Sequence, residues 1–340
     1  IAEADSNPKR GAGKKRPTRR TRFTVWAVER NGETILLHTH RTNAVVRHLL
    51  ERRRIPSLAS AQVLRAEVPY GRSRFDFLME EEGKEFFLEV KSVTLFGNRA
   101  ALFPDAVTER GRHHILKLAE LGDEAIKQGL PRPVVLFLIH SSRVDRFLPD
   151  YHTDLEFSRA FLEVRDRVRI IPVSVGWTRT LELTEKVEEL PVPWEFLSRE
   201  VSDSGAYLVL MKVEHEELFD VGRLGPVAFP AGWYIYVGSA MKNLTARINR
   251  HLRKRKKFHW HIDYLRNQAA KVSVLPIRSS KRAECSVARA LSDLLAPHAA
   301  GFGSSDCDCA THLFFSPEKP TNSRAFHDFL ERFRMPLLDG

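Results

Sequence analysis

Cysteine is scarce in this 340-residue chain, and long hydrophobic runs are missing. Three cysteines cannot build a disulfide framework, so the composition favours a reducing compartment, and we expect a cytoplasmic protein. The apolar run Val134–Ile139 has only six residues. It is far shorter than the about 18 residues that cross a bilayer, so no membrane partner is expected. The first residues are basic and carry no apolar core of a secretory signal.

What the chain does contain is typical of a folded, soluble protein. Hydrophobic residues make up 43% of the sequence and charged residues 29%, which excludes a disordered or fibrous chain. The length is sufficient for two or three domains that each bury a core of their own. No P-loop or GxGxxG fingerprint is present, so a nucleotide-binding enzyme is not indicated.

Positive charge is concentrated in two segments of the chain. Residues 1–22 hold eight Lys or Arg against two acids, and residues 247–257 hold seven with no acid. The net charge is +11, so the rest of the chain is close to neutral. Two separate basic clusters favour a nucleic-acid partner over a leader that only improves solubility. The predicted nucleic-acid contacts are Arg19, Arg20, Arg22, Arg74, Arg110, Arg250, Arg253, Lys254, Lys256 and Lys257.

Short β-rich runs alternate with amphipathic segments, which predicts a mixed α/β fold. Strands are expected at 23–28, 34–38, 62–68, 74–79, 85–93, 134–139, 167–175, 207–213 and 233–237. Helices are expected at 43–53, 108–127, 154–165, 243–255, 260–266, 283–295 and 326–334. Pro191 and Pro193 indicate a linker, because closely spaced prolines resist both helix and central strand.

Asp76, Glu89 and Lys91 form the first group of candidate catalytic residues. Glu89 and Lys91 are two residues apart in an apolar strand, so both side chains point to the same face. A hairpin across the acidic turn at 80–83 brings the Asp76 carboxylate toward Glu89. Two carboxylates suit a hard cation such as Mg²⁺ or Mn²⁺, with the lysine orienting a water nucleophile. The spacing alone leaves a surface salt bridge equally open.

The text around this group resembles a known family. Asp…Glu-x-Lys is the signature of the PD-(D/E)xK nuclease fold, and SRFDF, LEVKSVTL and FPDAVTERGRHH resemble the sugar fermentation stimulation protein A family over about residues 22–194. The resemblance implies an OB-like β-barrel over 22–80 that suits single strands. A PD-(D/E)xK restriction-endonuclease-like α/β domain over 81–197 is implied after it, with Asp76 contributed from the boundary. Members look like DNA-binding proteins and DNA or RNA nucleases.

Two details of that resemblance concern neighbouring residues. His113 and His114 are adjacent, so only one of them can face the cleft from a helix. Asp105 either lines the cleft or caps the following helix. The segment Arg41-Thr42-Asn43 departs from the Asn-Thr-Gly that is expected there, which puts a ligand contact by this loop in doubt.

A second group consists of Tyr207, Tyr236, Arg247, His251 and Glu284. Gly205-Ala206-Tyr207 and Tyr236-Val237-Gly238, with the later residues, resemble the GIY-YIG nuclease superfamily over about 205–315. WHIDYL and GFGSSDCDC resemble an uncharacterised prokaryotic branch of it. The resemblance implies a small α+β domain over 204–316, followed by a C-terminal helix over 317–340.

The same resemblance implies roles for the second group. Glu284 holds a divalent metal, Arg247 stabilises charge on the phosphate, and Tyr207 activates water together with Tyr236 or His251. An unperturbed phenol has a pKa of about 10 and is a poor base at neutral pH without help from a cation. The alternative is a domain that only binds nucleic acid, and the two readings stay open.

The three cysteines lie near this second group. Cys307, Cys309 and His312 fall within six residues, and Cys285 supplies a fourth zinc ligand if the fold brings it near. Because the spacing is not that of a standard zinc finger, a small hydrophobic cluster of thiols is the favoured reading.

The sequence therefore predicts a nuclease that hydrolyses phosphodiester bonds in DNA or RNA with Mg²⁺ or Mn²⁺, and that has a second nuclease-like domain. The predicted metal ligands are Asp76, Glu89 and Glu284. Residues 1–21 are predicted to be a basic disordered tail. The alternative is a non-catalytic DNA-binding regulator of sugar-fermentation and maltose-metabolism genes.

Overall fold

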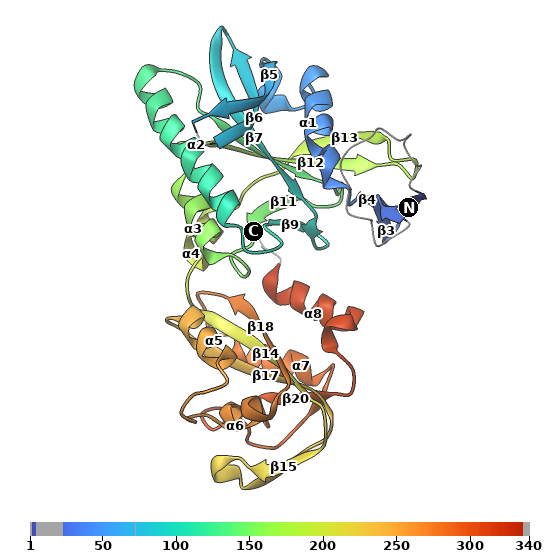
Figure 1. Ribbon diagram of the computed structural model, residues 1–340, viewed down its shortest axis with the longest axis vertical. Helices are drawn as coiled ribbons and strands as arrows, with labels where there is room; N and C mark the ends of the chain where they lie inside the picture. Colours follow the sequence, from blue (N-terminus) through green and yellow to red (C-terminus); the bar gives the residue numbers. More distant parts are fainter. Residues whose placement is uncertain (1, 5–22, 72, 336–340) are drawn as a thin grey trace, which may run out of the picture. The chain divides into compact units, whose positions relative to one another are not determined.

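The computed structural model describes residues 2–4, 23–71 and 73–335 (Figure 1). The chain divides into two compact units, Ile1–Pro149 with Ala160–Pro193, and Asp150–Arg159 with Trp194–Gly340. The boundary between Pro193 and Trp194 falls at the proline segment that is predicted as a linker. Arg19, Arg20 and Arg22, and most of the predicted tail 1–21, lie outside the described residues. Within the described part of the chain, no helix is long and apolar enough to cross a membrane.

A six-stranded mixed sheet organises the first unit, in the order β13-β12-β10-β7-β6-β5. Its central strand β10 runs parallel to β7 and β12, and the outer pairs are antiparallel. Every residue of β10 is buried, which explains why the longest apolar run of this unit lies there. The strands are β5 (Gln62–Tyr70), β6 (Ser73–Glu81), β7 (Lys84–Val93), β10 (Val134–Ile139), β12 (Arg169–Trp177) and β13 (Leu183–Glu189).

Helices cover both faces of this sheet. Helix α1 (Thr42–Glu51) packs Val46 and Leu49 against the face of β7 that carries Leu88. Helix α2 (Glu109–Gln128) connects toward β10 and lies on the other side of β7 (Figure 1). The Thr108 side chain accepts a hydrogen bond from the backbone N–H of Gly111 at 3.0 Å, so Thr108 and not Asp105 caps α2.

The smaller strands of the first unit do not close a barrel. Strands β5 and β6 belong to the large sheet, because β6 forms a hairpin with β7 and shares its apolar core. Among the described residues no closed barrel is present, so the OB-like barrel expected over 22–80 is not confirmed, and its boundary at residue 80 falls inside β6. The other strands are β1 (Ala2–Ala4), β2 (Phe23–Val25), β3 (Ala27–Arg30), β4 (Glu33–Leu36), β8 (Leu95–Phe96), β9 (Ala100–Phe103) and β11 (Arg146–Pro149).

The second unit contains an antiparallel five-stranded sheet in the order β18-β14-β17-β20-β19. Strands β14 and β17 pair along their whole length, with Tyr207 directly opposite Gly238. A separate hairpin joins β15 (Glu217–Asp220) and β16 (Pro226–Phe229). The sheet strands are β14 (Gly205–Val213), β17 (Gly232–Ala240), β18 (Lys271–Arg278), β19 (Ala296–Pro297) and β20 (Leu313–Ser316).

Two helix pairs form separate cores with this second sheet. One core contains Leu244 and Ile262, from α5 and α6, and the other contains Leu291 and Phe326, from α7 and α8. The helix that was expected as a separate C-terminal element is therefore part of this unit's packing. The helices of the chain not yet bounded are α3 (Leu155–Glu163), α4 (Trp194–Glu200), α5 (Leu244–Leu252), α6 (His261–Gln268), α7 (Glu284–Ser292) and α8 (Arg324–Arg334).

Candidate active sites

The β6–β7 hairpin brings Asp76 beside Glu89 and Lys91, in the arrangement that the sequence predicted. The Asp76 Oδ2 atom accepts a hydrogen bond from the backbone N–H of Val90 at 2.7 Å. Lys91 Nζ donates to Glu89 Oε1, also at 2.7 Å, so the two residues share one face of β7 as their spacing requires. The first group is thus a single cluster at the end of the hairpin.

Two further side chains hold this cluster. His114, on α2, places its Nδ1 atom 2.6 Å from Glu89 Oε1, whereas the adjacent His113 is exposed. Asn43, on α1, donates from Nδ2 to Asp76 Oδ1 at 2.7 Å. His114 was within the quoted motif, but its role was not assigned. Asn43 belongs to the segment 41–43 that departs from the family pattern, and only the packing of α1 against β7 shows that it reaches Asp76.

Both carboxyl groups are largely buried, but their neighbours give them different electrostatic environments. Burial raises the pKa of Asp76, the nearby Glu89 raises it further, and the hydrogen bonds from Val90 and Asn43 only partly oppose this. Burial also acts to raise the pKa of Glu89, which is 4% exposed, but His114 and Lys91 outweigh it and lower that pKa. Of the two carboxylates, Glu89 therefore keeps its negative charge to lower pH.

The cluster is suited to a divalent cation. Glu89 Oε1 accepts from both Lys91 and His114, but the buried Oε2 atom has no hydrogen-bond partner. A buried carboxylate oxygen without a donor costs free energy, and a cation beside it removes that cost. Oxygen ligands from Glu89 and Asp76 are those that Mg²⁺ prefers. The residues of this site thus fit the metal that the sequence predicted.

In the second unit, two glycines make room for the two predicted tyrosines. A Cβ atom at Gly238 would overlap the hydroxyl of Tyr207, and one at Gly303 would overlap the ring of Tyr236. Gly303 also has a φ of +73°, which side chains other than glycine rarely adopt. Glycine beside each ring thus leaves the space that lets both phenol rings lie at the same part of the sheet surface.

A cleft of about 390 Å³ opens at that place. Tyr207, Tyr236, Arg247 and Glu284 all line it, so the structure brings together four of the five residues in the second group. The fifth, His251, is buried behind the cleft, with Nε2 2.9 Å from the Tyr207 hydroxyl. Residues to which the sequence assigned no role complete the lining, namely Ser239 of β17, His261 of α6, and His259, Trp260, Arg282, Gly303, Ser305 and Asp306 between the elements.

Burial makes both Tyr207 and His251 poor general bases at neutral pH. Burial raises the pKa of Tyr207, and the opposing effect of Arg247 is smaller. Burial lowers the pKa of His251 to about 3, with Lys256 adding to the effect. The Tyr207 phenol and the His251 imidazole are therefore both neutral at pH 7, and a hydrogen bond joins the hydroxyl to Nε2. Across the cleft, Glu284 accepts a hydrogen bond from the Ser239 hydroxyl through Oε2.

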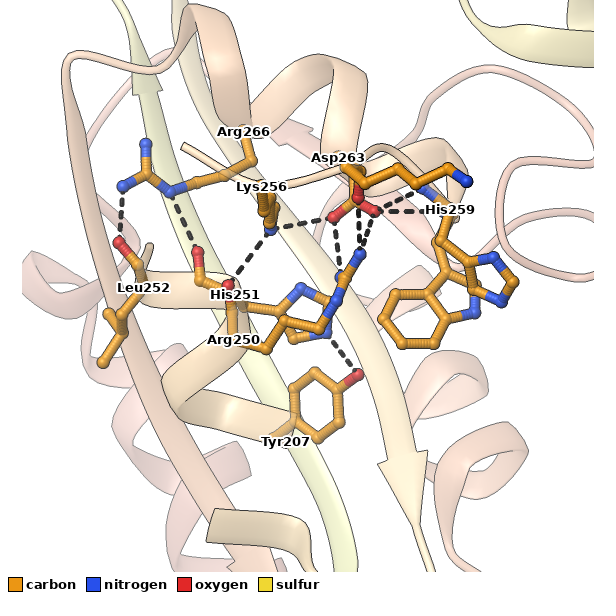
Figure 2. A network of polar contacts seen from close by, with 10 residues as sticks. Tyr207, Arg250, His251, Leu252, Lys256, His259, Asp263 and Arg266 are labelled. Atoms are coloured by element: carbon orange, nitrogen blue, oxygen red, sulfur yellow. Dashed lines mark hydrogen bonds and ion pairs between the residues drawn. The ribbon is translucent and has the colours of Figure 1, made fainter. Parts of the chain in front are cut away.

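A polar network fixes the end of α5 behind the cleft (Figure 2). Asp263 is fully buried and accepts from both Nη atoms of Arg250, at 3.0 and 2.9 Å. Lys256 Nζ lies 2.8 Å from Asp263 Oδ1. Arg250 and Lys256 were predicted to contact nucleic acid, but both are engaged by this carboxylate, so the free cationic surface is smaller than the sequence suggested.

The same network positions two residues of the candidate site. Arg266 donates to the backbone carbonyl groups of His251 and Leu252, at 2.9 and 2.7 Å (Figure 2). The guanidinium groups of Arg247 and Arg250 each lie 4.2 Å from the centre of the Trp260 ring. Arg247 is thereby held at the cleft wall.

The other predicted nucleic-acid contacts are on the surface. Arg253, Lys254 and Lys257 are exposed after α5, and Arg110 is exposed in the first turn of α2. Arg74 is exposed and pairs with Glu67 at 3.0 Å. Their role in binding nucleic acid remains a prediction.

Two family models match the chain, one in each unit. Residues 40–180 match the sugar fermentation stimulation protein RE domain, and residues 206–335 match a domain of unknown function, DUF123. The second match falls on the segment with the GIY-YIG-like pattern and extends through α8.

Relatives of the first unit carry the name of sugar fermentation stimulation protein homolog. The one from Clostridium tetani is 39% identical over 147 residues, which are 43% of this chain and 62% of the relative. The one from Methanosphaera stadtmanae is 33% identical over 46% of this chain and 64% of the relative. The one from Clostridium perfringens is 34% identical over 51% of this chain and 74% of the relative. The chain thus spans less than two thirds of the first two relatives.

A solved structure also resembles the chain. It is the structure of Pyrococcus furiosus SfsA in complex with Ca²⁺. The two sequences are 24% identical, and the superposition covers 53% of this chain and 75% of the Pyrococcus protein with a TM-score of 0.46.

Proposed function

The chain belongs to the sugar fermentation stimulation protein family and carries a DUF123 domain, and from this premise we propose that it is a divalent-metal-dependent nuclease acting on DNA or RNA. The first unit is proposed as a PD-(D/E)xK nuclease-like domain and the second as a GIY-YIG-like domain. The observation that carries the proposal is the buried Glu89 Oε2 atom, which has no protein partner and lies beside a second carboxylate and a lysine.

The proposed mechanism in the first unit assigns one task to each side chain. Asp76 and Glu89 would hold Mg²⁺ or Mn²⁺, which would supply positive charge for the phosphate and lower the pKa of a bound water. Lys91 is only partly exposed and keeps its ammonium group 2.7 Å from Glu89, where it orients the attacking water and stabilises the developing charge. His114 fixes the Glu89 rotamer through Nδ1.

The second unit is proposed to act on the same class of substrate. Glu284 would hold a cation at the cleft and Arg247 would stabilise charge on the phosphate, while Tyr207 would activate water together with Tyr236 or His251. The exposed Arg253, Lys254 and Lys257 extend the cationic surface along the nucleic-acid backbone. Carboxylates facing a phosphate would repel it without a cation between them, which argues against a role in binding alone.

Cleavage assays test the proposed function. We expect purified protein to cut end-labelled single-stranded DNA, duplex DNA or RNA in Mg²⁺ or Mn²⁺ and not in EDTA. Activity lost in Lys91→Ala assigns the cut to the first unit, and activity lost in Arg247→Ala assigns it to the second. Salt-sensitive binding of these strands without cleavage in any metal would refute the nuclease and favour a DNA-binding regulator.

The contact of Asn43 with Asp76 predicts a shift in pH dependence. The hydrogen bond from Asn43 favours the charged carboxylate and lowers its pKa against the effect of burial. Asn43→Ala removes it, so the Asp76 pKa rises and the carboxylate is protonated at higher pH. The acid limb of the rate profile is therefore expected to move toward alkaline pH, as measured by initial cleavage rates in a buffer series. An unchanged acid limb would show that Asp76 does not limit the rate.

A further inference from the structure

Three thiols and one imidazole converge beside the second cleft. The ligand atoms of Cys285, Cys307, Cys309 and His312 all lie within 4.8 Å of one another. Cys285 comes from the first turn of α7, and the other three come from the loop that leads into β20. His312 is buried, whereas the three thiols are partly exposed. Such convergence of four strong metal ligands is not what a simple hydrophobic cluster requires.

The chemistry and spacing of this group match a tetrahedral zinc site. A zinc ion with Zn–S of about 2.3 Å and Zn–N of about 2.0 Å places its sulfur and nitrogen ligands about 3.5 Å apart. The Cys307 Sγ atom lies 3.4 Å from His312 Nε2. Three cysteines and one histidine are also one of the common ligand sets of structural zinc. The sequence named these four residues but favoured a cluster of thiols without metal, because Cys285 joins the other three only through the fold.

The second nitrogen of the imidazole connects this group to the cleft. His312 Nδ1 lies 3.2 Å from Oε1 of Glu284, the carboxylate assigned to the catalytic cation. Histidines that ligate zinc usually donate their other N–H group to a carboxylate, which fixes the ring and its tautomer. Here the carboxylate that receives this hydrogen bond is itself a candidate site residue.

We propose that Cys285, Cys307, Cys309 and His312 bind one structural Zn²⁺ ion, and that His312 then acts as a positioning residue for Glu284. The ion joins the start of α7 to the loop before β20, and both segments border the cleft. The zinc site stands on its own geometry. The positioning of Glu284 rests on the proposed function of the second unit.

Metal analysis of the full chain tests the zinc site. Protein purified without chelators is expected to contain one zinc per chain by mass spectrometry. The Cys309→Ser and His312→Gln variants are expected to lose it, and His215→Gln, which alters an exposed histidine, is expected to keep it. The proposal would be overturned if all three thiols of the unaltered protein react freely with a thiol reagent and the protein takes up no zinc on reconstitution. This measurement uses no variant, so misfolding of a variant cannot affect it.

Cobalt substitution identifies the ligands. Co²⁺ in the proposed site is expected to give thiolate charge-transfer bands and the intense visible absorption bands of tetrahedral coordination. Both sets of bands are expected to disappear in the Cys309→Ser variant. Weak octahedral bands that persist in Cys309→Ser would place the metal on oxygen ligands elsewhere and overturn the site.

A second readout separates the two parts of the proposal. If the second unit is a nuclease, zinc removal is expected to reduce its kcat, and readdition is expected to restore it. Full activity after removal would refute the positioning of Glu284 by His312. If zinc is bound but Arg247-dependent cleavage is absent, only the proposed function of the second unit fails, and the zinc site remains.

Discussion

Replacing Glu89 by glutamine is expected to reduce metal-dependent cleavage by the first unit about 10³-fold or more, equivalent to at least about 4 kcal/mol of transition-state stabilisation. Glutamine keeps the size of the side chain but removes the negative charge that binds the cation. It also presents an NH₂ group either to the free Oε2 position or to Lys91 and His114, which both approach Oε1. Both effects weaken metal binding at the buried site.

Steady-state rates at saturating Mn²⁺ and Mg²⁺ measure this loss. Glu85→Gln is a matched control, because Glu85 lies on the same strand and is exposed at the far end of the hairpin. The control is expected to cleave like the unaltered protein, and circular dichroism checks that both variants fold. Equal activity of Glu89→Gln and Glu85→Gln would remove Glu89 from the metal site.

Local rules were sufficient for the core of the first site. Alternation along FFLEVK predicted that Glu89 and Lys91 share a face, and the acidic turn predicted the hairpin that brings Asp76 to them. Asn43 and His114 come from helices that pack on opposite sides of β7, so no spacing along the chain marks their contacts with the carboxylates. Such contacts follow only from tertiary packing.

Charge in a sequence does not show which cations are already paired. Arg250 and Lys256 were counted in a basic run, yet both form ion pairs with the carboxylate of Asp263, which lies later in the chain. The OB-like barrel that the family resemblance implied over 22–80 is a similar case, because β5 pairs with β6, and β6 pairs onward with β7 outside that segment. In both cases the partner lies outside the segment from which the prediction was made.

The second large effect is expected for Asp263→Asn, which should destabilise the second unit by about 3–5 kcal/mol. Asp263 is 0% exposed and also accepts backbone hydrogen bonds from His259 and Trp260, at 2.9 and 3.1 Å. Asparagine keeps the shape of the side chain but removes its negative charge. The cations of Arg250 and Lys256 then lose the buried anion with which they pair. The exchange of backbone amide hydrogens in α6 with solvent deuterium measures this loss as a lower free energy of opening.

The effect should depend on pH in a defined direction. Burial acts to raise the Asp263 pKa, but Arg250, Lys256 and the two backbone donors outweigh it and hold the pKa well below its usual range. The stabilisation is therefore fully present above the unfolded pKa of about 3.9 and is lost as the pH falls through the lower folded value. The difference between the two proteins should be largest near neutral pH and shrink below about pH 4. Asp220→Asn, on an exposed hairpin, should show no such difference at any pH. A difference for Asp263→Asn that is constant down to acid pH would mean that lost packing, and not the lost charge, causes the instability.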